Sequence, residues 1–310
     1  MKKVFIDGKA GTTGLRIYER LADRDDITLI LLSDEERKDT EARRKALNGC
    51  DIAFLCLPDD AAREAVSLIE NPDVVVIDAS TAHRTEKGWS YGFPELSADF
   101  EEKLRTSKRI ANPGCHASGF IALVYPLVEA GILPRDALLS CHSITGYSGG
   151  GKKMIADYEG EDRDVLLDYP RQYGIGQGHK HLKEMRYVTG LDDAPLFSPI
   201  VSDFYSGMEV TVPLFAKNLN EGYTLDHVKE TLKKKYKGDI VKYVDCADDE
   251  GFLSAGKLAG KDSMIVTVCG NADRFILVAL YDNLGKGASG AAVECMNIVM
   301  GEAPEKGLVI

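Results

Sequence analysis

The first third of the chain alternates short apolar runs with amphipathic segments. Apolar residues recur at helical spacing in residues 15–22 and 62–69, and Pro58 followed by two aspartates is typical of a helix start. Four intervening runs have the length and composition of buried parallel strands: residues 4–7, 27–32, 52–57 and 74–78. Repeated βα units of this kind predict a doubly wound parallel sheet of the Rossmann type, with ligands at its carboxyl edge.

The pattern changes from about residue 137 onward, where strands dominate. The expected strands are residues 138–144, 208–215, 240–244, 264–269 and 275–281. One clear helix, residues 225–236, is expected among them, and a helix rich in small residues is expected at 287–299. Strands that follow one another closely in this way predict a second, α+β domain.

Charge and hydropathy narrow the function classes. The net charge of −11 disfavours nucleic acid as a partner, since binding to phosphates needs a basic face. No apolar run approaches the length of a membrane span, and Asp7 interrupts the N-terminal run before a signal-peptide core forms. We therefore expect a cytoplasmic protein that acts on a small molecule.

The seven cysteines are scattered and include no CxxC pair, which fits neither a disulfide framework nor a zinc site. Six of them are expected to be small buried hydrophobes. Cys115 differs because Pro113 and Gly114 before it signal a turn, and an apolar helix pattern follows it. A helix N-terminus stabilises the thiolate, which is the form that attacks an acyl carbon.

A GxxGxxG loop follows the first predicted strand and opens a helix. Its glycines would let the backbone approach a pyrophosphate, which the N–H groups at the helix start would then bind. The predicted cofactor contacts in this loop are Gly8, Gly11, Thr12, Thr13 and Gly14.

The residues after the second predicted strand bear on the choice of nicotinamide cofactor. Asp34 could bind a ribose diol, which favours NAD, whereas Ser33 and Arg37 could hold a 2′-phosphate, which favours NADP. The prediction is NADP, with Ser33 and Arg37 as contacts. Ser80, in the loop after the fourth strand, is a further predicted cofactor contact.

A catalytic thiolate needs a proton donor and acceptor, and His179 and His181 are the candidates. Glu184 lies one helical turn beyond His181, where its carboxylate could orient an imidazole. The alternative is a metal half-site, but no further ligand cluster completes a zinc set. Catalysis is therefore predicted, and the sequence leaves open which histidine serves.

Two further loops carry groups suited to an anionic substrate. Ser148, Gly149 and Lys152 could form an anion cradle, although the same composition is typical of a flexible loop. Arg84, after the fourth strand, could bind a carboxylate or form a surface salt bridge.

These motifs together resemble those of the N-acetyl-γ-glutamyl-phosphate reductases of arginine biosynthesis, in particular the shorter of the family's two forms. The resemblance spans nearly the whole chain, in order. It is carried by the glycine loop at 8–14, YGFPEL at 91–96, NPGC at 112–115, HKH at 179–181 with Glu184, and YDNLGKGASGAA at 281–292.

The resemblance implies a two-domain, semialdehyde dehydrogenase-like enzyme that reduces its acyl phosphate with NADPH through a thioester on Cys115. It places Asn283 near the nicotinamide, and Asn112 with Arg84 and the 148–152 loop near the substrate. It also implies a discontinuous dinucleotide-binding domain, 1–114 plus 285–310, and a catalytic and oligomerisation domain, 115–284. A homodimer or homotetramer is then expected.

Three other functions share part of this pattern. Aspartate-semialdehyde dehydrogenase has the same chemistry, but the paired histidines and the YGFPEL segment favour the glutamyl enzyme. A lysine-pathway reductase acting on a substrate carried by an acidic protein would need a basic surface, which the negative net charge disfavours. A redox-sensing dinucleotide-binding regulator without catalysis would need no activated thiol.

Overall fold

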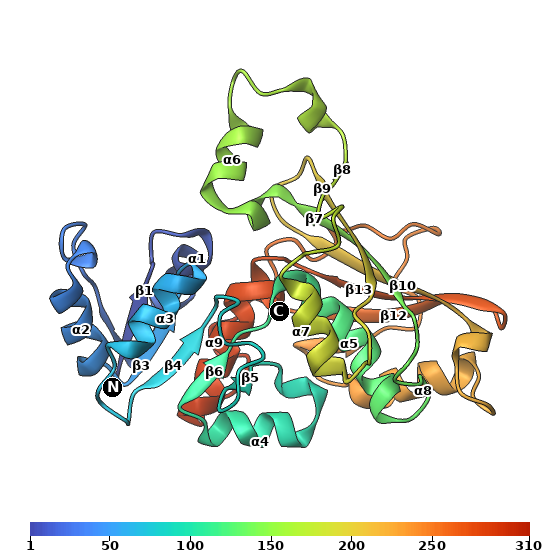
Figure 1. The fold of residues 1–310 in the computed structure, drawn as a ribbon, viewed down its shortest axis with the longest axis horizontal. Coiled ribbons are helices and arrows are strands. Elements are labelled where there is room, and N and C mark those ends of the chain that lie inside the picture. The colour runs from blue at the N-terminus through green and yellow to red at the C-terminus, as the bar shows by residue number, and fades with distance from the viewer. The chain divides into compact units, whose positions relative to one another are not determined.

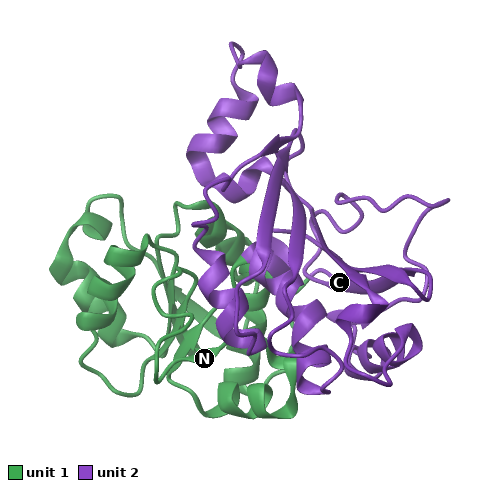
Figure 2. Cartoon of the chain, turned by 45° about the vertical axis from the view of Figure 1, so that its right-hand side comes forward, with its two compact units in different colours: residues 1–114, 288–308 green, residues 115–287, 309–310 purple.

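The computed structural model describes residues 1–310, which form two compact units (Figure 2). The first unit contains Met1–Gly114 and Ala288–Leu308. The second contains Cys115–Gly287 and the last two residues, Val309–Ile310. The chain therefore leaves the first unit directly before Cys115 and returns after the glycine-rich segment that follows Asn283.

The first unit is built on a six-stranded parallel sheet with the strand order β2-β1-β3-β4-β6-β5 (Figure 1). Its strands are β1 (Lys2–Asp7), β2 (Ile27–Ile30), β3 (Ile52–Leu55), β4 (Val75–Asp78), β5 (Ser90–Tyr91) and β6 (Arg109–Ala111). Its helices are α1 (Thr12–Leu21), α2 (Thr40–Gly49), α3 (Asp59–Ser67), α4 (Ala98–Thr106) and α9 (Gly290–Met300). Short 3-10 turns lie at Glu36–Lys38 and Pro94–Leu96. The predicted doubly wound parallel sheet is confirmed.

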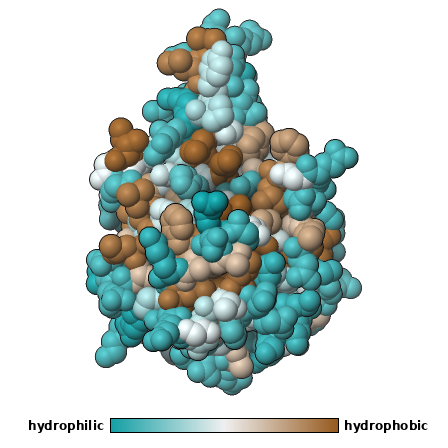
Figure 3. Space-filling view, turned by 90° about the vertical axis from the view of Figure 1, so that its right-hand side faces the viewer, coloured by the Kyte–Doolittle hydropathy of each residue, from teal (hydrophilic) through white to brown (hydrophobic).

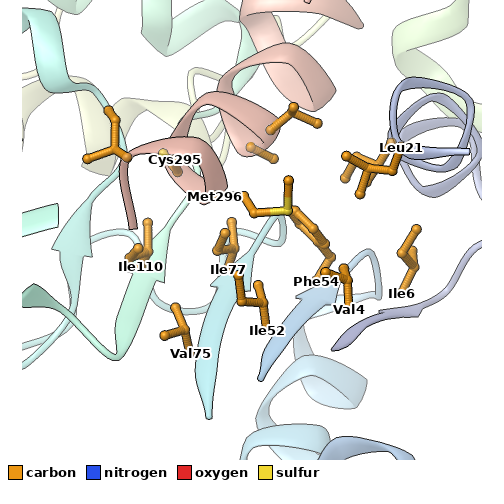
Figure 4. Close-up of a cluster of buried hydrophobic side chains, with 14 of the residues drawn as sticks. Val4, Ile6, Leu21, Ile52, Phe54, Val75, Ile77, Ile110, Cys295 and Met296 are labelled. Carbon is orange, nitrogen blue, oxygen red and sulfur yellow. The ribbon is translucent and has the colours of Figure 1, made fainter. Parts of the chain in front are cut away.

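Both faces of this sheet are covered, which explains the uninterrupted apolar runs in the sequence. Alternate residues of β1 point to opposite sides, so that Val4 and Ile6 belong to one buried cluster and Phe5 to another. Met296 of α9 belongs to the first cluster, and Leu47 of α2 to the second. Figure 4 shows the first cluster, in which Met296 and Cys295 lie over the strands. The C-terminal helix is thus part of the core of the first unit.

The second unit is built on a seven-stranded mixed sheet with the order β11-β12-β13-β10-β7-β9-β8. Its strands are β7 (Ser140–Gly146), β8 (Arg171–Gln172), β9 (Leu196–Ser202), β10 (Met208–Phe215), β11 (Val241–Tyr243), β12 (Met264–Gly270) and β13 (Arg274–Tyr281). Its helices are α5 (Cys115–Glu129), α6 (Gly151–Glu159), α7 (His181–Thr189) and α8 (Leu225–Lys235). Short turns lie at Tyr147–Gly150, Val165–Asp168, Ala216–Asn218 and Gly285–Ser289. This α+β unit confirms the predicted second fold class.

The sequence-based description of the second unit was wrong in three details. Only one helix was expected among its strands, yet α6 and α7 also form there. Strands β8 and β9 were not expected: β8 has only two residues, and Pro199 interrupts the apolar run of β9, since proline is uncommon inside strands. The expectation that the six other cysteines are buried holds for Cys50, Cys141 and Cys295, whereas Cys56 and Cys269 are partly exposed and Cys246 is exposed.

Helix length and composition also bear on membrane association. No helix combines the length and the apolar character that crossing a bilayer would require.

Candidate active site

Cys115 is the first residue of α5, and its side chain is partly exposed. The rest of the helix is apolar and mostly buried, so the cysteine lies at the open end of a helix anchored in the core of the second unit. The first N–H groups of a helix lack partners within the helix and attract negative charge. An added Cβ on Gly287 would lie 3.2 Å from the Cβ of Cys115, so the glycine allows the backbone to pass close to the nucleophile.

The two predicted histidines lie together, at the start of α7, which packs beside α5 (Figure 1). Their ring centroids are 4.7 Å apart, and the backbone N–H of His181 donates to Nδ1 of His179 at 3.2 Å. The neutral ring of His179 therefore carries its proton on Nε2. His181 and Glu184 are both buried in the first turn of α7. The proximity of the three predicted residues supports a shared site.

Burial lowers the pKa of His179 below its ordinary value of 6.5, and the neighbouring charge of Lys180 adds to this effect. The imidazole of His179 is therefore neutral at neutral pH and able to accept a proton.

His116 is a member of this cluster that the sequence interpretation missed. It is 3% exposed, and its ring centroid lies 5.7 Å from that of His179 and 5.6 Å from that of His181. Its Nδ1 lies 2.6 Å from Oγ of Ser143, and its Nε2 lies 2.6 Å from the hydroxyl of Tyr173. The only signal for His116 in the sequence was its position directly after Cys115.

Burial keeps the imidazole of His116 neutral. Desolvation, with smaller contributions from His179 and Lys180, lowers the pKa of His116 to about 3. Burial, together with the nearby charge of Cys115, raises the pKa of Tyr173 above its ordinary value, so the phenol keeps its proton. Since a neutral imidazole has one N–H, His116 either donates to Ser143 and accepts from Tyr173, or accepts from Ser143 and donates to Tyr173. In the second arrangement, the Tyr173 proton is available to another acceptor.

The glycine-rich segment after β7 is held by hydrogen bonds. The N–H groups of Tyr147 and Ser148 donate to the carbonyls of Phe204 and Tyr205, both at 3.0 Å. Ser148 is buried, whereas Gly149 and Lys152 are exposed, with Lys152 in the first turn of α6. The segment is therefore structured rather than an open loop.

Asn283 connects the glycine-rich segment after β7 to Gly207, which precedes β10. Its Nδ2 donates to Oγ of Ser148 at 3.0 Å, and its Oδ1 accepts from the N–H of Gly207 at 2.9 Å. The structure thus brings Asn283 and Ser148 together, although the sequence interpretation had assigned them to different ligands.

The glycine loop of the first unit fits a dinucleotide. Gly8 has a φ of 89°, and a Cβ there would lie 2.3 Å from the carbonyl oxygen of Cys56. A Cβ on Gly14 would lie 2.5 Å from the carbonyl oxygen of Gly8. Gly11 is the N-cap of α1 and has no capping side chain, so the N–H groups at Thr12 and Thr13 begin the helix without a side-chain acceptor at the cap. This arrangement is the one that pyrophosphate binding at a helix N-terminus requires.

A cavity of about 260 Å³ lies beside this loop in the first unit. It is lined by residues of the loop and of the segment after β2, including Gly8, Lys9, Asp34 and Arg37. Asp34 and Arg37 form an ion pair of 2.9 Å. Oγ of Ser33 accepts from the N–H of Glu36 at 3.2 Å. The acid that suits a ribose diol and the base that suits a 2′-phosphate therefore lie at the same cavity.

The loop after β4 is tied to its own unit. Asp78 accepts hydrogen bonds from Oγ of Ser80 at 2.7 Å and, at 2.6 Å, from Nδ1 of His83. Arg84 is buried and donates to the carbonyls of Asn112 at 2.9 Å and Ala79 at 3.1 Å. Arg84 is therefore buried rather than exposed at the surface, and two of its donors are used by backbone carbonyls.

Comparisons with known proteins agree with this architecture. Residues 3–104 match the semialdehyde dehydrogenase NAD binding domain, and residues 115–283 match the semialdehyde dehydrogenase dimerisation domain. N-acetyl-gamma-glutamyl-phosphate reductase 2 of Nostoc sp. is 45% identical over 320 aligned positions, which cover 99% of each chain. The N-acetyl-gamma-glutamyl-phosphate reductase of Brucella ovis is 46% identical and covers 97% of this chain and 99% of its own.

A solved structure of aspartate semialdehyde dehydrogenase II from Vibrio cholerae has the same fold. Its TM-score is 0.73 at 19% identity, and the match covers 97% of this chain and 98% of that one.

Proposed function

This chain belongs to the N-acetyl-gamma-glutamyl-phosphate reductase family, and we propose that it reduces N-acetyl-γ-glutamyl phosphate to the semialdehyde, with Cys115 as the nucleophile. The observation that carries the assignment of the nucleophile is the position of Cys115 at the start of α5, beside α7 and its histidines. The reaction is a step of arginine biosynthesis.

In the proposed mechanism, the thiolate of Cys115 attacks the γ-acyl carbon, a carbon–sulfur bond forms, and the bond to phosphate breaks. The product of this step is a thioester on Cys115. The N–H groups at the start of α5 stabilise the carbonyl oxygen as it becomes negative. The apolar, buried body of the helix keeps these donors in place.

Proton transfer is assigned to the histidine cluster. His179 or His181 donates a proton to the carbonyl oxygen in the tetrahedral states and recovers it when the carbonyl re-forms. His179 suits this role because its neutral ring carries the proton on Nε2. Glu184, in the first turn of α7, is the predicted orienting group for His181.

The residues that would hold the cofactor are Gly8, Gly11, Thr12, Thr13 and Gly14 at the pyrophosphate, with Ser33, Arg37 and Ser80 as further contacts. A bound nicotinamide would supply the hydride that reduces the thioester. The carbon–sulfur bond then breaks as the carbonyl re-forms, which releases the semialdehyde and restores the thiolate of Cys115. Arg37 favours NADPH over NADH because a guanidinium pairs strongly with a 2′-phosphate. The substrate contacts proposed are Asn112, Arg84, Ser148, Gly149 and Lys152.

We also propose a cytoplasmic homodimer or homotetramer. The match of residues 115–283 to a dimerisation domain supports self-association. Large side chains with apolar surface are exposed in the segment after α6: Val165, Leu166, Tyr169 and Ile175. Figure 3 shows hydrophobic surface, in brown, near the top of that view. Light scattering after size-exclusion chromatography would give the mass of the assembly, and a monomer at micromolar concentration would contradict this part of the proposal.

The test of the function is phosphate-dependent reduction of NADP by the purified enzyme. N-acetylglutamate semialdehyde and aspartate semialdehyde are offered separately to wild type, Cys115→Ser and Cys246→Ser, the last being a control at an exposed cysteine. We expect turnover with the acetylated substrate, lost in Cys115→Ser and retained in Cys246→Ser. Turnover with aspartate semialdehyde instead would identify the protein as an aspartate-semialdehyde dehydrogenase. Full activity of Cys115→Ser would show that Cys115 is not the nucleophile.

A further inference from the structure

The hydroxyl of Tyr281 touches both ends of the first turn of α5. Tyr281 is the last residue of β13 and is fully buried. Its hydroxyl donates to the carbonyl oxygen of Cys115 at 2.5 Å and accepts from the N–H of Gly119 at 3.1 Å. One helical turn brings together the carbonyl of residue 115, an acceptor, and the N–H of residue 119, a donor. A side chain from a strand thus bridges the turn that carries the nucleophile.

Gly119 makes this approach possible. A Cβ at this position would lie 2.7 Å from the Tyr281 hydroxyl and 2.7 Å from Cβ of Val210, which is too close for any side chain. Val210 belongs to β10, which pairs with β13 in the same sheet. The first turn of α5 therefore packs directly against β10 and β13. The phenol of Tyr281 lies between these strands and the backbone of Cys115.

The phenol remains a donor throughout the working pH range. Burial raises the pKa of Tyr281 well above its ordinary value of 10, and the nearby Cys115 acts in the same direction. A protonated hydroxyl donates its single proton to the Cys115 carbonyl and keeps its lone pairs for the N–H of Gly119.

The two residues after Tyr281 also make hydrogen bonds to segments near the nucleophile. Asp282 accepts hydrogen bonds from Oγ of Ser206 at 2.7 Å and from the N–H of Leu284 at 2.7 Å. Asn283 holds Ser148, as described above. The end of β13 thus connects the nucleophile's backbone to the glycine-rich segment within one unit.

We propose that Tyr281 is a positioning residue for the reaction, because its hydroxyl fixes the peptide that carries Cys115 and so sets where the sulfur lies at the start of α5. Fixing this carbonyl leaves the cysteine side chain with one rotatable bond between the anchored backbone and the sulfur. Displacement of a reacting atom by about 1 Å can lower a rate about 100-fold. This inference rests on the role of Cys115 proposed above.

The test compares Tyr281→Phe with Tyr236→Phe. Tyr236 is also buried, and its hydroxyl donates to the carbonyl of Ala122 in the same helix at 2.7 Å. Both variants remove one hydroxyl that bonds to the backbone of α5, so both melting temperatures should fall. The fall should be larger for Tyr281→Phe, which loses two hydrogen bonds rather than one. Only Tyr281→Phe removes the bond to Cys115.

Two readouts separate positioning from a structural effect. The first is steady-state kinetics, in which Tyr281→Phe should lower kcat about 10- to 100-fold with little change in KM, while Tyr236→Phe stays within about threefold of wild type. The second is the pH dependence of alkylation by iodoacetamide, followed by mass spectrometry of the Cys115 peptide. Its midpoint should move to higher pH in Tyr281→Phe only.

Equal kinetics and equal alkylation profiles in the two variants would overturn the positioning role. Failure of the proposed function would look different, since modification of Cys115 would then leave wild-type turnover intact. Both readouts are taken below the melting temperatures of both variants, so that loss of folding does not imitate either result.

Discussion

Nε2 of His116 lies 2.6 Å from the hydroxyl of Tyr173, and both groups are held in their neutral forms by burial. On its other side, His116 contacts Ser143 on β7. Because burial lowers the pKa of His116 to about 3, the ring is neutral, so that one nitrogen carries a proton and the other accepts. The residue after the nucleophile is thus a fixed neutral imidazole rather than a titrating base.

This neutrality predicts how stability depends on pH. The pKa of His116 is about 3 in the folded protein against an ordinary value of 6.5, so the unfolded chain binds the proton first. The free energy of unfolding should therefore fall as pH drops below about 6.5, at about 1.4 kcal/mol per pH unit for each such proton.

The measurement is urea unfolding of wild type, His116→Gln and His142→Gln between pH 7 and 4.5. His142 is exposed on β7, and its replacement is the control for loss of a histidine. His116→Gln should make the slope of unfolding free energy against pH shallower by the contribution of about one proton. Part of the slope that remains is due to His179. Identical slopes in the three proteins would mean that His116 titrates normally.

Gly8 and Gly88 offer a matched pair for the cofactor loop. Both have a φ of 89°, but a Cβ at Gly88 meets nothing within 4 Å, whereas one at Gly8 meets the backbone of Cys56. Gly88→Ala should cost about 1–2 kcal/mol of unfolding free energy from backbone strain alone and leave NADPH binding unchanged.

Gly8→Ala should cost at least about 3 kcal/mol, because the clash adds to the same strain, and it should abolish NADPH binding. Fluorescence titration with NADPH and denaturant unfolding together measure the two effects. If both variants bind NADPH as tightly as wild type, the loop does not hold the pyrophosphate.

Arg37 is predicted to select the phosphorylated cofactor. Arg37→Ala should raise the Kd for NADPH about 10-fold and leave the Kd for NADH nearly unchanged, because only the first carries a 2′-phosphate. Arg44→Ala is the control, since Arg44 pairs with Glu70 on another part of the first unit. An equal loss of affinity for both cofactors would point to a general charge effect.

Asn283 is predicted to act on the substrate site through Ser148. Asn283→Asp keeps an oxygen for the N–H of Gly207 but loses the donor to Ser148. We expect KM for the acyl phosphate to rise about fivefold, since one hydrogen bond is worth about 1 kcal/mol. Asn220→Asp, at an exposed amide bonded to Gly131, is the control. An unchanged KM in Asn283→Asp would show that the Ser148 segment does not take part in substrate binding.

Strands β1 to β4 of the first unit were predictable because they are rich in apolar residues, whereas β5 and β6, which have two and three residues, were not expected. Phe5 and Ile6 face opposite cores, so the strand is apolar throughout and its pattern is clear in the sequence. Strand β9 could not be predicted, because Pro199 disfavours a strand at that place. The strand forms nevertheless because it pairs with β7. The short helices α6 and α7 lie beside glycines and polar residues that are equally typical of loops.

The candidate site likewise contains residues that local sequence signals predict and residues whose environment depends on distant parts of the chain. Cys115 was identified from Pro113 and Gly114, which are local signals for a turn before a helix. His116 was missed because its environment comes from Ser143 and Tyr173, which are 27 and 57 residues away in the chain. The fixing of the first turn of α5 by Tyr281 depends on a contact across 166 residues and has no local signature.

The most direct test of the central claim is to trap the acyl group on Cys115. The enzyme is mixed with N-acetyl-γ-glutamyl phosphate in the absence of NADPH, quenched in acid, and digested for mass spectrometry. The account predicts an N-acetylglutamyl adduct on the Cys115 peptide, with release of one phosphate per adduct, and none in Cys115→Ser. An adduct elsewhere in the chain, or reduction of the acyl phosphate by Cys115→Ser when NADPH is added, would contradict it.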